Sequence, residues 1–325
     1  MKEYRAKLSS AVVYPILQSQ CAITGTKITT LVCEYPRVIH AQLLTHRVFS
    51  KNSSSTRAVP LKAAIQQILD NPAKYIWTEN QSGMQGKVIT DPIKLERIEK
   101  VYDDAKRAAI AYAKALGDKG IDDGLNVHKQ NAGRLLEPFQ NIRICLTSTE
   151  WENWDWLRID GAAQGEIQEL AELIKQARDE MPTQTLNKDE WHLPFIPTKR
   201  HEQTGQIFYC HPETDATIEL NRAIKISMSI CAQTSYRKED CSDEKTEKVI
   251  SNLFTGNKVH ASPSEHQATP IGFVDTTGVG SFQEVLELMP TGSTHIDNNG
   301  DLWSGNFKHW IQNRQLISNH DAAKF

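Results

Sequence analysis

The sequence lacks any long uninterrupted apolar run. No segment approaches the roughly 18 consecutive apolar residues that a membrane-spanning helix needs. The first twenty residues contain no apolar core of the kind found in signal peptides, and they carry charges at Lys2, Glu3, Arg5 and Lys7. We therefore expect a soluble, cytoplasmic protein that has no membrane partner.

The sequence also lacks an excess of positive charge and a regular cysteine pattern. Acidic residues outnumber Lys plus Arg by 40 to 37, so we expect no general attraction to nucleic acid, and any anion site must be local. The six cysteines form no C-x-x-C pair, which favours reduced thiols over disulfides and predicts no metal site. With 325 residues, of which 39% are hydrophobic, the chain can form one large domain or two ordinary ones.

Local patterns predict a mixture of strands and helices. Residues 26–35 are rich in β-branched side chains and lie between a glycine and a proline, which predicts a strand, and a helix should follow within residues 36–49. Caps and apolar spacing predict further helices over residues 61–70, 92–117, 216–233, 242–256 and 307–317, two helices that separate near residue 160, and strands at residues 141–147 and 206–210. The irregular stretch 182–214 is the best candidate for a subdomain boundary.

Residues 45–60, THRVFSKNSSSTRAVP, allow two interpretations. A serine-rich stretch is typical of a flexible linker. However, the predicted helix with an apolar face places His46 and Arg47 at the beginning of this stretch. Arg57 adds a rigid, forked hydrogen-bond donor further along. Serine and asparagine side chains between these cations can donate neutral hydrogen bonds to a phosphate. The residues alone leave the linker and the phosphate site equally open.

The spacing of this stretch resembles the signature R-H-R-x-x-S-x-N-x-x-S-x-R of flavin-dependent thymidylate synthases, with Thr45 in place of the first arginine. Four other segments resemble pieces of the same family: GRLLEPF, LRIDGAAQGEI, CAQTSY and HASPSEHQATP. They also depart from it, with Ala162 in a histidine position, Gln233 in an arginine position and Ser264 in a phenylalanine position; Ser53 replaces a residue that is usually acidic.

The order of these segments differs from the usual family chain, in which the last two come first. The sequence therefore resembles a longer, circularly permuted branch of the family, and permutation is physically reasonable because chain termini often lie close together. The resemblance implies an α+β fold of the flavin-dependent thymidylate synthase kind, permuted, with a helical insertion over residues 61–125. We expect one such domain over residues 1–325, with a nucleotide-binding half at 1–196 and a permuted half at 197–325 that carries the flavin and folate segments.

The resemblance also implies an activity. The family methylates dUMP at C5 to give dTMP: methylenetetrahydrofolate supplies the carbon, FAD carries the reducing equivalents and NADPH recharges the flavin. Family members assemble as homotetramers whose active sites draw residues from several subunits, so we expect an oligomer whose partners are these small molecules, with no nucleic acid and no metal.

Three sets of site residues follow from the matched positions. The dUMP-binding set is Gln42, Ser55, Arg57, Arg134 and Arg158. The FAD-binding set is His46, Arg47, Asn52, Asn153, Ser235, Ser262 and Glu265. The catalytic set is Arg158, Ser55 and His260, in which Arg158 stabilises developing charge on the pyrimidine and His260 lies where folate and flavin meet.

Other interpretations remain open for these residues and for the chain. Taken alone, Arg134 and Arg158 have acidic neighbours and are typical of surface ion pairs. If water intercepts the transferred methylene before hydride does, the product is a 5-hydroxymethyl pyrimidine nucleotide. The departures at Thr45 and Ala162 also permit a nucleotide-binding homologue that is not an enzyme.

Overall fold

A computed structural model describes residues 2–83, 86–117, 119, 124–254, 259–271, 281, 284 and 287–320. Its centre is a six-stranded sheet with the order β1-β2-β3-β5-β4, in which β6 also pairs with β2. The β2–β6 pair is parallel and the other pairs are antiparallel. The strands are β1 (Tyr4–Arg5), β2 (Val12–Cys21), β3 (Lys27–Pro36), β4 (Ser50–Ser53), β5 (Asn141–Ser148) and β6 (Gln184–Leu186).

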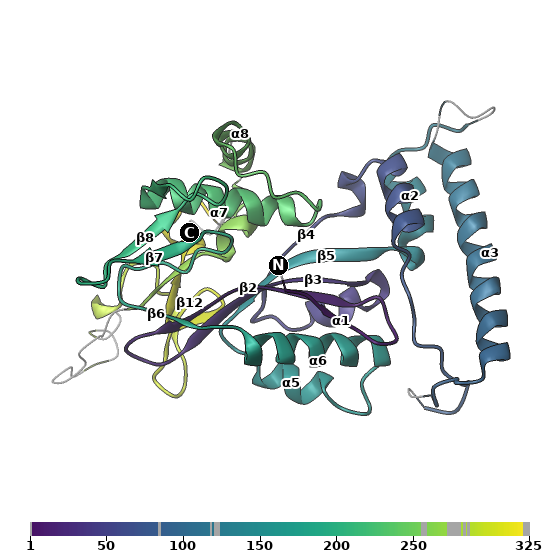
Figure 1. Cartoon of the computed structure of the whole chain (residues 1–325), viewed down its shortest axis with the longest axis horizontal. Coiled ribbons are helices and arrows are strands. Elements are labelled where there is room, and N and C mark those ends of the chain that lie inside the picture. The colour runs from purple at the N-terminus through teal and green to yellow at the C-terminus, as the bar shows by residue number, and fades with distance from the viewer. Residues whose placement is uncertain are drawn as a thin grey trace.

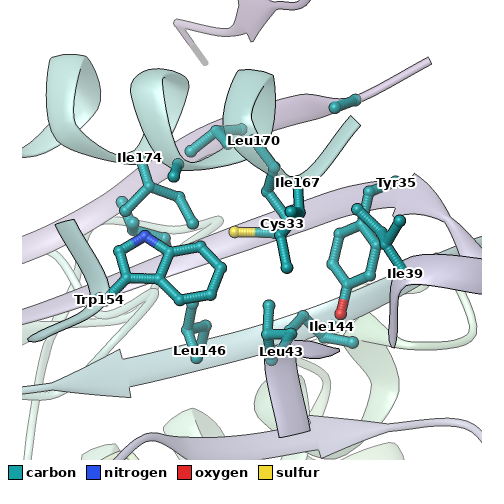
Figure 2. Packing of buried hydrophobic residues seen from close by; sticks show 14 of the residues in the cluster. Cys33, Tyr35, Ile39, Leu43, Ile144, Leu146, Trp154, Ile167, Leu170 and Ile174 are labelled. Atoms are coloured by element: carbon teal, nitrogen blue, oxygen red, sulfur yellow. The ribbon is translucent and has the colours of Figure 1, made fainter. Parts of the chain in front are cut away.

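Two helices, α5 (Glu152–Arg158) and α6 (Gly165–Glu180), cover one face of this sheet (Figure 1). Along α6, Ile167, Leu170 and Ile174 recur at helical spacing and are all buried, because they form the side of the helix that meets β2 and β3. Trp154 of α5 lies in the same core (Figure 2). The helices predicted on either side of residue 160 are confirmed.

Helix α7 (Leu220–Thr234) lies on the opposite face of the sheet, and α8 (Asp243–Phe254) packs outside it (Figure 1). Three small antiparallel sheets accompany them: β7 (Thr198–Arg200) with β8 (Ile207–Cys210) and β9 (Thr217–Ile218); β10 (Ala268–Pro270) with β14 (Trp310–Gln312); and β11 (His295–Ile296) with β12 (Leu302–Ser304) and β13 (Phe307–Lys308). The molecule therefore has helices on both faces of a mostly antiparallel sheet, which confirms the α+β prediction.

Helices α2 (Leu61–Asp70) and α3 (Pro92–Gly117) lie at one end of the sheet, and their predicted bounds are confirmed (Figure 1). They pack against the short helix α4 (Lys129–Ala132) and the 3₁₀ helix η3 (Gly133–Phe139). Ile68, Ile110 and Leu136 are buried in a separate small core at this end.

The prediction of a final helix over residues 307–317 is wrong. This segment forms β13, β14 and the 3₁₀ helix η5 (Asn313–Leu316). His309 has a φ of 60°, which interrupts any right-handed helix at that point. Trp310 and Ile311 are buried in β14, where pairing with β10 suits their aromatic and β-branched side chains better than a helix would.

Two other differences concern element boundaries. Strand β2 was not predicted because Pro15 falls inside it; the register shifts between Pro15 and Leu17, so the sheet accommodates the missing N–H at an irregularity. The helix predicted from residue 216 begins only at Leu220, because Thr217 and Ile218 are taken up by β9. The C-terminal end predicted for the 242–256 helix lies outside the described residues.

In the part of the chain that the structure describes, no helix combines the length and apolarity needed to cross a membrane.

Candidate functional site

Arg158, the last residue of α5, contacts the C-terminal end of α1 (His40–Leu44). We call the residues that meet there the Arg158 pocket: Gln42, Thr45, His46 and Arg158. Arg158 Nε donates to His46 Nε2 at 3.1 Å, and its NH2 group donates to the Gln42 carbonyl and to Thr45 Oγ1, both at 3.3 Å. Its NH1 group contacts Gln42 Oε1 at 3.5 Å. Residues about 110 positions apart are thus joined around one half-buried guanidinium.

His46 is neutral in this pocket. Its side chain is 4% exposed and packs against the rings of Phe49 and Trp154. Burial lowers its pKa to about 4, and the cations of Arg158 and Lys51 add to the shift. A neutral imidazole can accept the Arg158 Nε–H at Nε2, whereas an imidazolium could not. Burial also lowers the pKa of Arg158, but a guanidinium remains charged at any physiological pH.

A second line of hydrogen bonds runs from Gln42 away from Arg158. Gln42 Nε2 donates to Gln164 Oε1 at 2.6 Å, and Gln164 Nε2 donates to Glu166 Oε2 at 2.8 Å. Glu166 is buried at the start of α6, and its other oxygen accepts from the Ile76 N–H at 2.8 Å. These side chains and Arg158 line a cavity of about 490 Å³.

The departures at positions 45 and 162 have different consequences. Thr45 Oγ1 donates to the Gln42 carbonyl at 2.7 Å and accepts from Arg158, so it takes part in orienting the guanidinium. The motif gave no signal for this role, since an arginine was expected there. Ala162 lines the 490 Å³ cavity without contributing a polar side-chain atom. Gln233, in another arginine position, is buried and donates to Ser229 Oγ and the Asp240 carbonyl, which is a structural role.

Part of the predicted flavin set meets at Asn52 of β4. Its Nδ2 donates to the Cys231 carbonyl of α7 at 2.8 Å, and its Oδ1 accepts from Ser262 Oγ at 3.4 Å. Glu265 lies in the same 3₁₀ helix, η4 (Ser262–Glu265), and forms an ion pair with Arg314. Ser235 is buried at the C-terminal end of α7.

We call the residues predicted at the phosphate, Ser55, Arg57 and Arg134, the arginine surface; Arg134 lines a cavity of about 450 Å³ together with Ala41 and Leu44 of α1. It is built by the 3₁₀ helix η2 (Thr56–Ala58) and η3, which pack so closely that a Cβ on Gly133 would lie 3.2 Å from Thr56 Cγ2. Arg134 is 71% exposed, and its NH1 group lies 3.8 Å from Glu137 Oε1. Arg57 is exposed and makes no hydrogen bond or ion pair with any described residue.

Not all predicted residues are brought together within one chain. Among the described residues, no hydrogen bond or ion pair joins the Arg158 pocket to the arginine surface. The side chains of Arg47, Asn153 and His260 are exposed. The structure therefore brings together the Arg158 pocket and the Asn52 contacts and buries Ser235, whereas Ser55, Arg57, Arg134, Arg47, Asn153 and His260 are exposed.

The donor set fits a flavin dinucleotide in part. Arg47 supplies an exposed cation suited to a phosphate, and Asn153 supplies an exposed amide suited to a ring edge. By contrast, His46, Asn52 and Glu265 already have partners from the same chain. No cluster of three or more His, Cys, Asp or Glu side chains that could hold a metal ion occurs within the described ranges.

A comparison with protein families matches one region of the chain. The family model described as "Thymidylate synthase complementing protein" matches residues 22–183, which include both the Arg158 pocket and the arginine surface. The match runs through residues 61–125, so α2 and α3 lie inside the matched region.

A comparison with curated proteins found no match. Among solved structures, the chain is similar to a UMP/dUMP methylase, PolB from Streptomyces cacaoi, whose crystal structure holds 5-Br UMP. The two chains are 15% identical, with a TM-score of 0.42, and the alignment covers 55% of this chain and 92% of that chain.

Proposed function

Because the chain belongs to the family of thymidylate synthase complementing proteins, we propose that it methylates dUMP at C5 to form dTMP. In this proposal methylenetetrahydrofolate is the carbon donor and NADPH the reductant. Bound FAD would supply the redox chemistry, while the protein binds and orients the reactants. The observation that carries the proposal is the Arg158 pocket, because it presents an oriented cation beside a cavity large enough for a nucleobase.

Arg158 is suited to stabilise charge on a pyrimidine carbonyl. C5 of uracil becomes nucleophilic only when electron density moves into the ring and onto its oxygens. A guanidinium has five N–H donors, and four of those of Arg158 are directed at Gln42, Thr45 and His46. The remaining NH1 donor, and the one that contacts Gln42 at 3.5 Å, are available to a ligand oxygen. A donor held in place before the reaction needs no reorganisation when charge develops.

The arginine surface is suited to the nucleotide phosphate. A phosphate dianion favours forked donors, and Arg57 has no competing partner among the described residues. Ser55 is exposed beside it and can add a neutral hydrogen bond. Gln42, which we also predicted at the phosphate, has both ends of its amide engaged with Arg158 and Gln164, so we propose that it positions Arg158 in addition.

The division of the site supports assembly from several subunits. Among the described residues, no hydrogen bond or ion pair links the pocket that would hold the base to the surface that would hold the phosphate, although Arg134 lines a cavity together with Ala41 and Leu44 of α1. We propose that a homotetramer completes the site, with the arginine surface of one subunit facing the Arg158 pocket of another. Arg47 and Asn153, with Asn52, Ser235, Ser262 and Glu265, would line the FAD site, and the exposed His260 would meet folate and flavin there.

The test is to incubate the purified protein with dUMP, methylenetetrahydrofolate, FAD and NADPH and to identify the nucleotide product by mass. We expect dTMP, formed in step with NADPH oxidation and lost when any one component is omitted. A 5-hydroxymethyl product formed without net NADPH oxidation would show that the protein hydroxymethylates the nucleotide and does not methylate it. Unchanged dUMP under all conditions would contradict both reactions.

A further inference from the structure

Two cysteine thiols lie in contact between the central sheet and α7. Cys145 of β5 and Cys231 of α7 have their Sγ atoms 4.0 Å apart, and both side chains are fully buried. A disulfide bond is about 2.05 Å long, so the sulfur atoms need to approach by about 2 Å to bond.

Of the two thiols, Cys145 is the one whose neighbours favour the thiolate. Burial alone would raise the pKa of this thiol, but contacts with Cys231 and His266 outweigh burial and lower it. Burial would lower the pKa of His266, but the neighbouring Cys145 raises it. Thr147 Oγ1 fixes the imidazole through Nδ1 at 2.8 Å. The thiolate is the reactive form of cysteine, so an imidazole that accepts the thiol proton activates the sulfur.

The pair is connected directly to Asn52. In the β4–β5 ladder Asn52 is the register partner of Cys145, and its side-chain Nδ2 donates to the Cys231 carbonyl at 2.8 Å. Its Oδ1 accepts from Ser262, another residue of the proposed FAD set. Any movement of Cys231 toward Cys145 therefore displaces the acceptor that holds the Asn52 side chain.

We propose that Cys145 and Cys231 form a reversible disulfide on exposure to peroxide, and that this bond weakens flavin binding by displacing the Asn52 amide. The Cys145 thiolate attacks one peroxide oxygen, which gives a sulfenic acid and water once the released hydroxide takes a proton from His266. The Cys231 sulfur then attacks the sulfenic acid and releases a second water, so two thiols and one hydrogen peroxide give one disulfide and two waters. A dithiol reductant restores both thiols.

Cys33 provides a matched control. It is also fully buried in the central sheet, on β3, but its side chain lies in the core beneath α5 and α6 (Figure 2). Successive side chains of a strand point to opposite faces, and Cys33 is paired with Ile144, the neighbour of Cys145. Cys33 therefore faces away from the proposed disulfide.

The first readout is chemical and does not depend on catalysis. The full-length protein is treated with hydrogen peroxide, free thiols are alkylated, and a tryptic digest is analysed without reduction. Cleavage after arginine and lysine places Cys145 in the peptide 144–158 and Cys231 in the peptide 226–237, each as its only cysteine. We expect these two peptides joined in wild type and in Cys33→Ala. In Cys231→Ala we expect a Cys145 sulfenic acid that dimedone traps.

The second readout is FAD binding, which rests on the proposed function. We expect peroxide to weaken FAD binding about tenfold, as for loss of one well-formed hydrogen bond, and dithiothreitol to restore it. Cys145→Ala and Cys231→Ala should lose this response, while Cys33→Ala should keep it. Absence of the joined peptides in peroxide-treated wild type would overturn the proposal. Joined peptides with unchanged FAD binding would overturn the link to Asn52, and a protein that binds no FAD in its reduced state would contradict the proposed function instead.

Discussion

The Arg158 pocket and the arginine surface both present guanidinium groups, but the chain holds the first from several sides and leaves the second to solvent. Arg158 is half-buried and bonded to Gln42, Thr45 and His46. Arg57 has no partner among the described residues, and Arg134 is 71% exposed with one distant carboxylate.

This difference separates two tasks. A group that stabilises transition-state charge gains from being fixed in advance, because it then reorganises little during the reaction. A group that captures a phosphate needs a charge that no carboxylate of the same chain already occupies, and the ligand can order the side chain at an entropic cost. We therefore expect substitutions in the Arg158 pocket to act mainly on turnover, and those on the arginine surface to act mainly on binding.

The largest effect is expected for Arg158→Ala. Loss of an oriented charge should lower kcat by about a hundredfold or more while dUMP still binds. Steady-state kinetics with mass detection of dTMP measures the first quantity, and calorimetry with dUMP the second. Arg107→Ala, which removes an exposed arginine on α3 that is paired with Asp103 and Asp104, is the control and should be neutral. A hundredfold loss of dUMP affinity with unchanged kcat would reverse the assignment.

Arg57→Ala should reduce turnover at low dUMP by about a hundredfold or more as well, but through KM. Saturating dUMP should recover most of kcat, because the variant leaves the Arg158 pocket intact. A second surface variant, Arg134→Ala, should raise KM in the same direction and by less, because Glu137 already offsets part of its charge. If neither variant changes KM, the phosphate binds elsewhere.

Gln42→Ala should lower kcat by about tenfold, which is the scale of one or two hydrogen bonds to a charged group. The variant removes the acceptor for Arg158 NH1 and the link to Gln164. Gln42→Glu retains an acceptor and should keep more activity than Gln42→Ala at equal protein concentration. Equal losses in both variants would indicate that Gln42 contacts the substrate and does not position Arg158.

The smallest effect concerns stability and pH. His46 has a pKa of about 4 in the folded chain against 6.5 when unperturbed, so the unfolded state takes up more protons between these values. The contribution of His46 is fully present above pH 6.5 and is lost as pH falls toward 4. Urea unfolding from pH 7 downward should show a shallower decline for His46→Gln, whose amide oxygen accepts from Arg158 at every pH. The exposed His201→Gln should follow wild type; an identical slope for His46→Gln would contradict a neutral His46.

Sequence patterns predict much of the fold in segments where both the beginning and the end of an element carry a local signal. Both bounds of α2 and α3 were predicted, because a proline marks each beginning and apolar spacing continues to the end. The failures occur where tertiary pairing decides the structure. Pro15 concealed β2, and the segment that forms β14 has helix-like spacing but is held as a strand by β10.

For the site, sequence motifs predict which residues take part but not which contacts they make with one another. Motif matches single out both His46 and Arg158, but neither their hydrogen bond nor the contact of Arg158 with Thr45 follows from the motifs. A buried chain of side-chain hydrogen bonds links three strands, and no local sequence pattern predicts it. It runs from Ser19 through His192, Thr30 and Thr147 to His266. Such networks depend on which side chains the sheet places opposite one another, and that information is absent from spacing along the chain.

The central claim is that this chain replaces the hydrogen at C5 of dUMP. The most direct measurement uses dUMP that carries deuterium at C5, incubated with methylenetetrahydrofolate, FAD and NADPH, and follows deuterium in the solvent together with the nucleotide product. We predict that deuterium is released in step with dTMP by the wild type, and about a hundredfold more slowly by Arg158→Ala. Full retention of deuterium in dUMP that the wild-type protein has bound, with every cofactor present, would contradict the account.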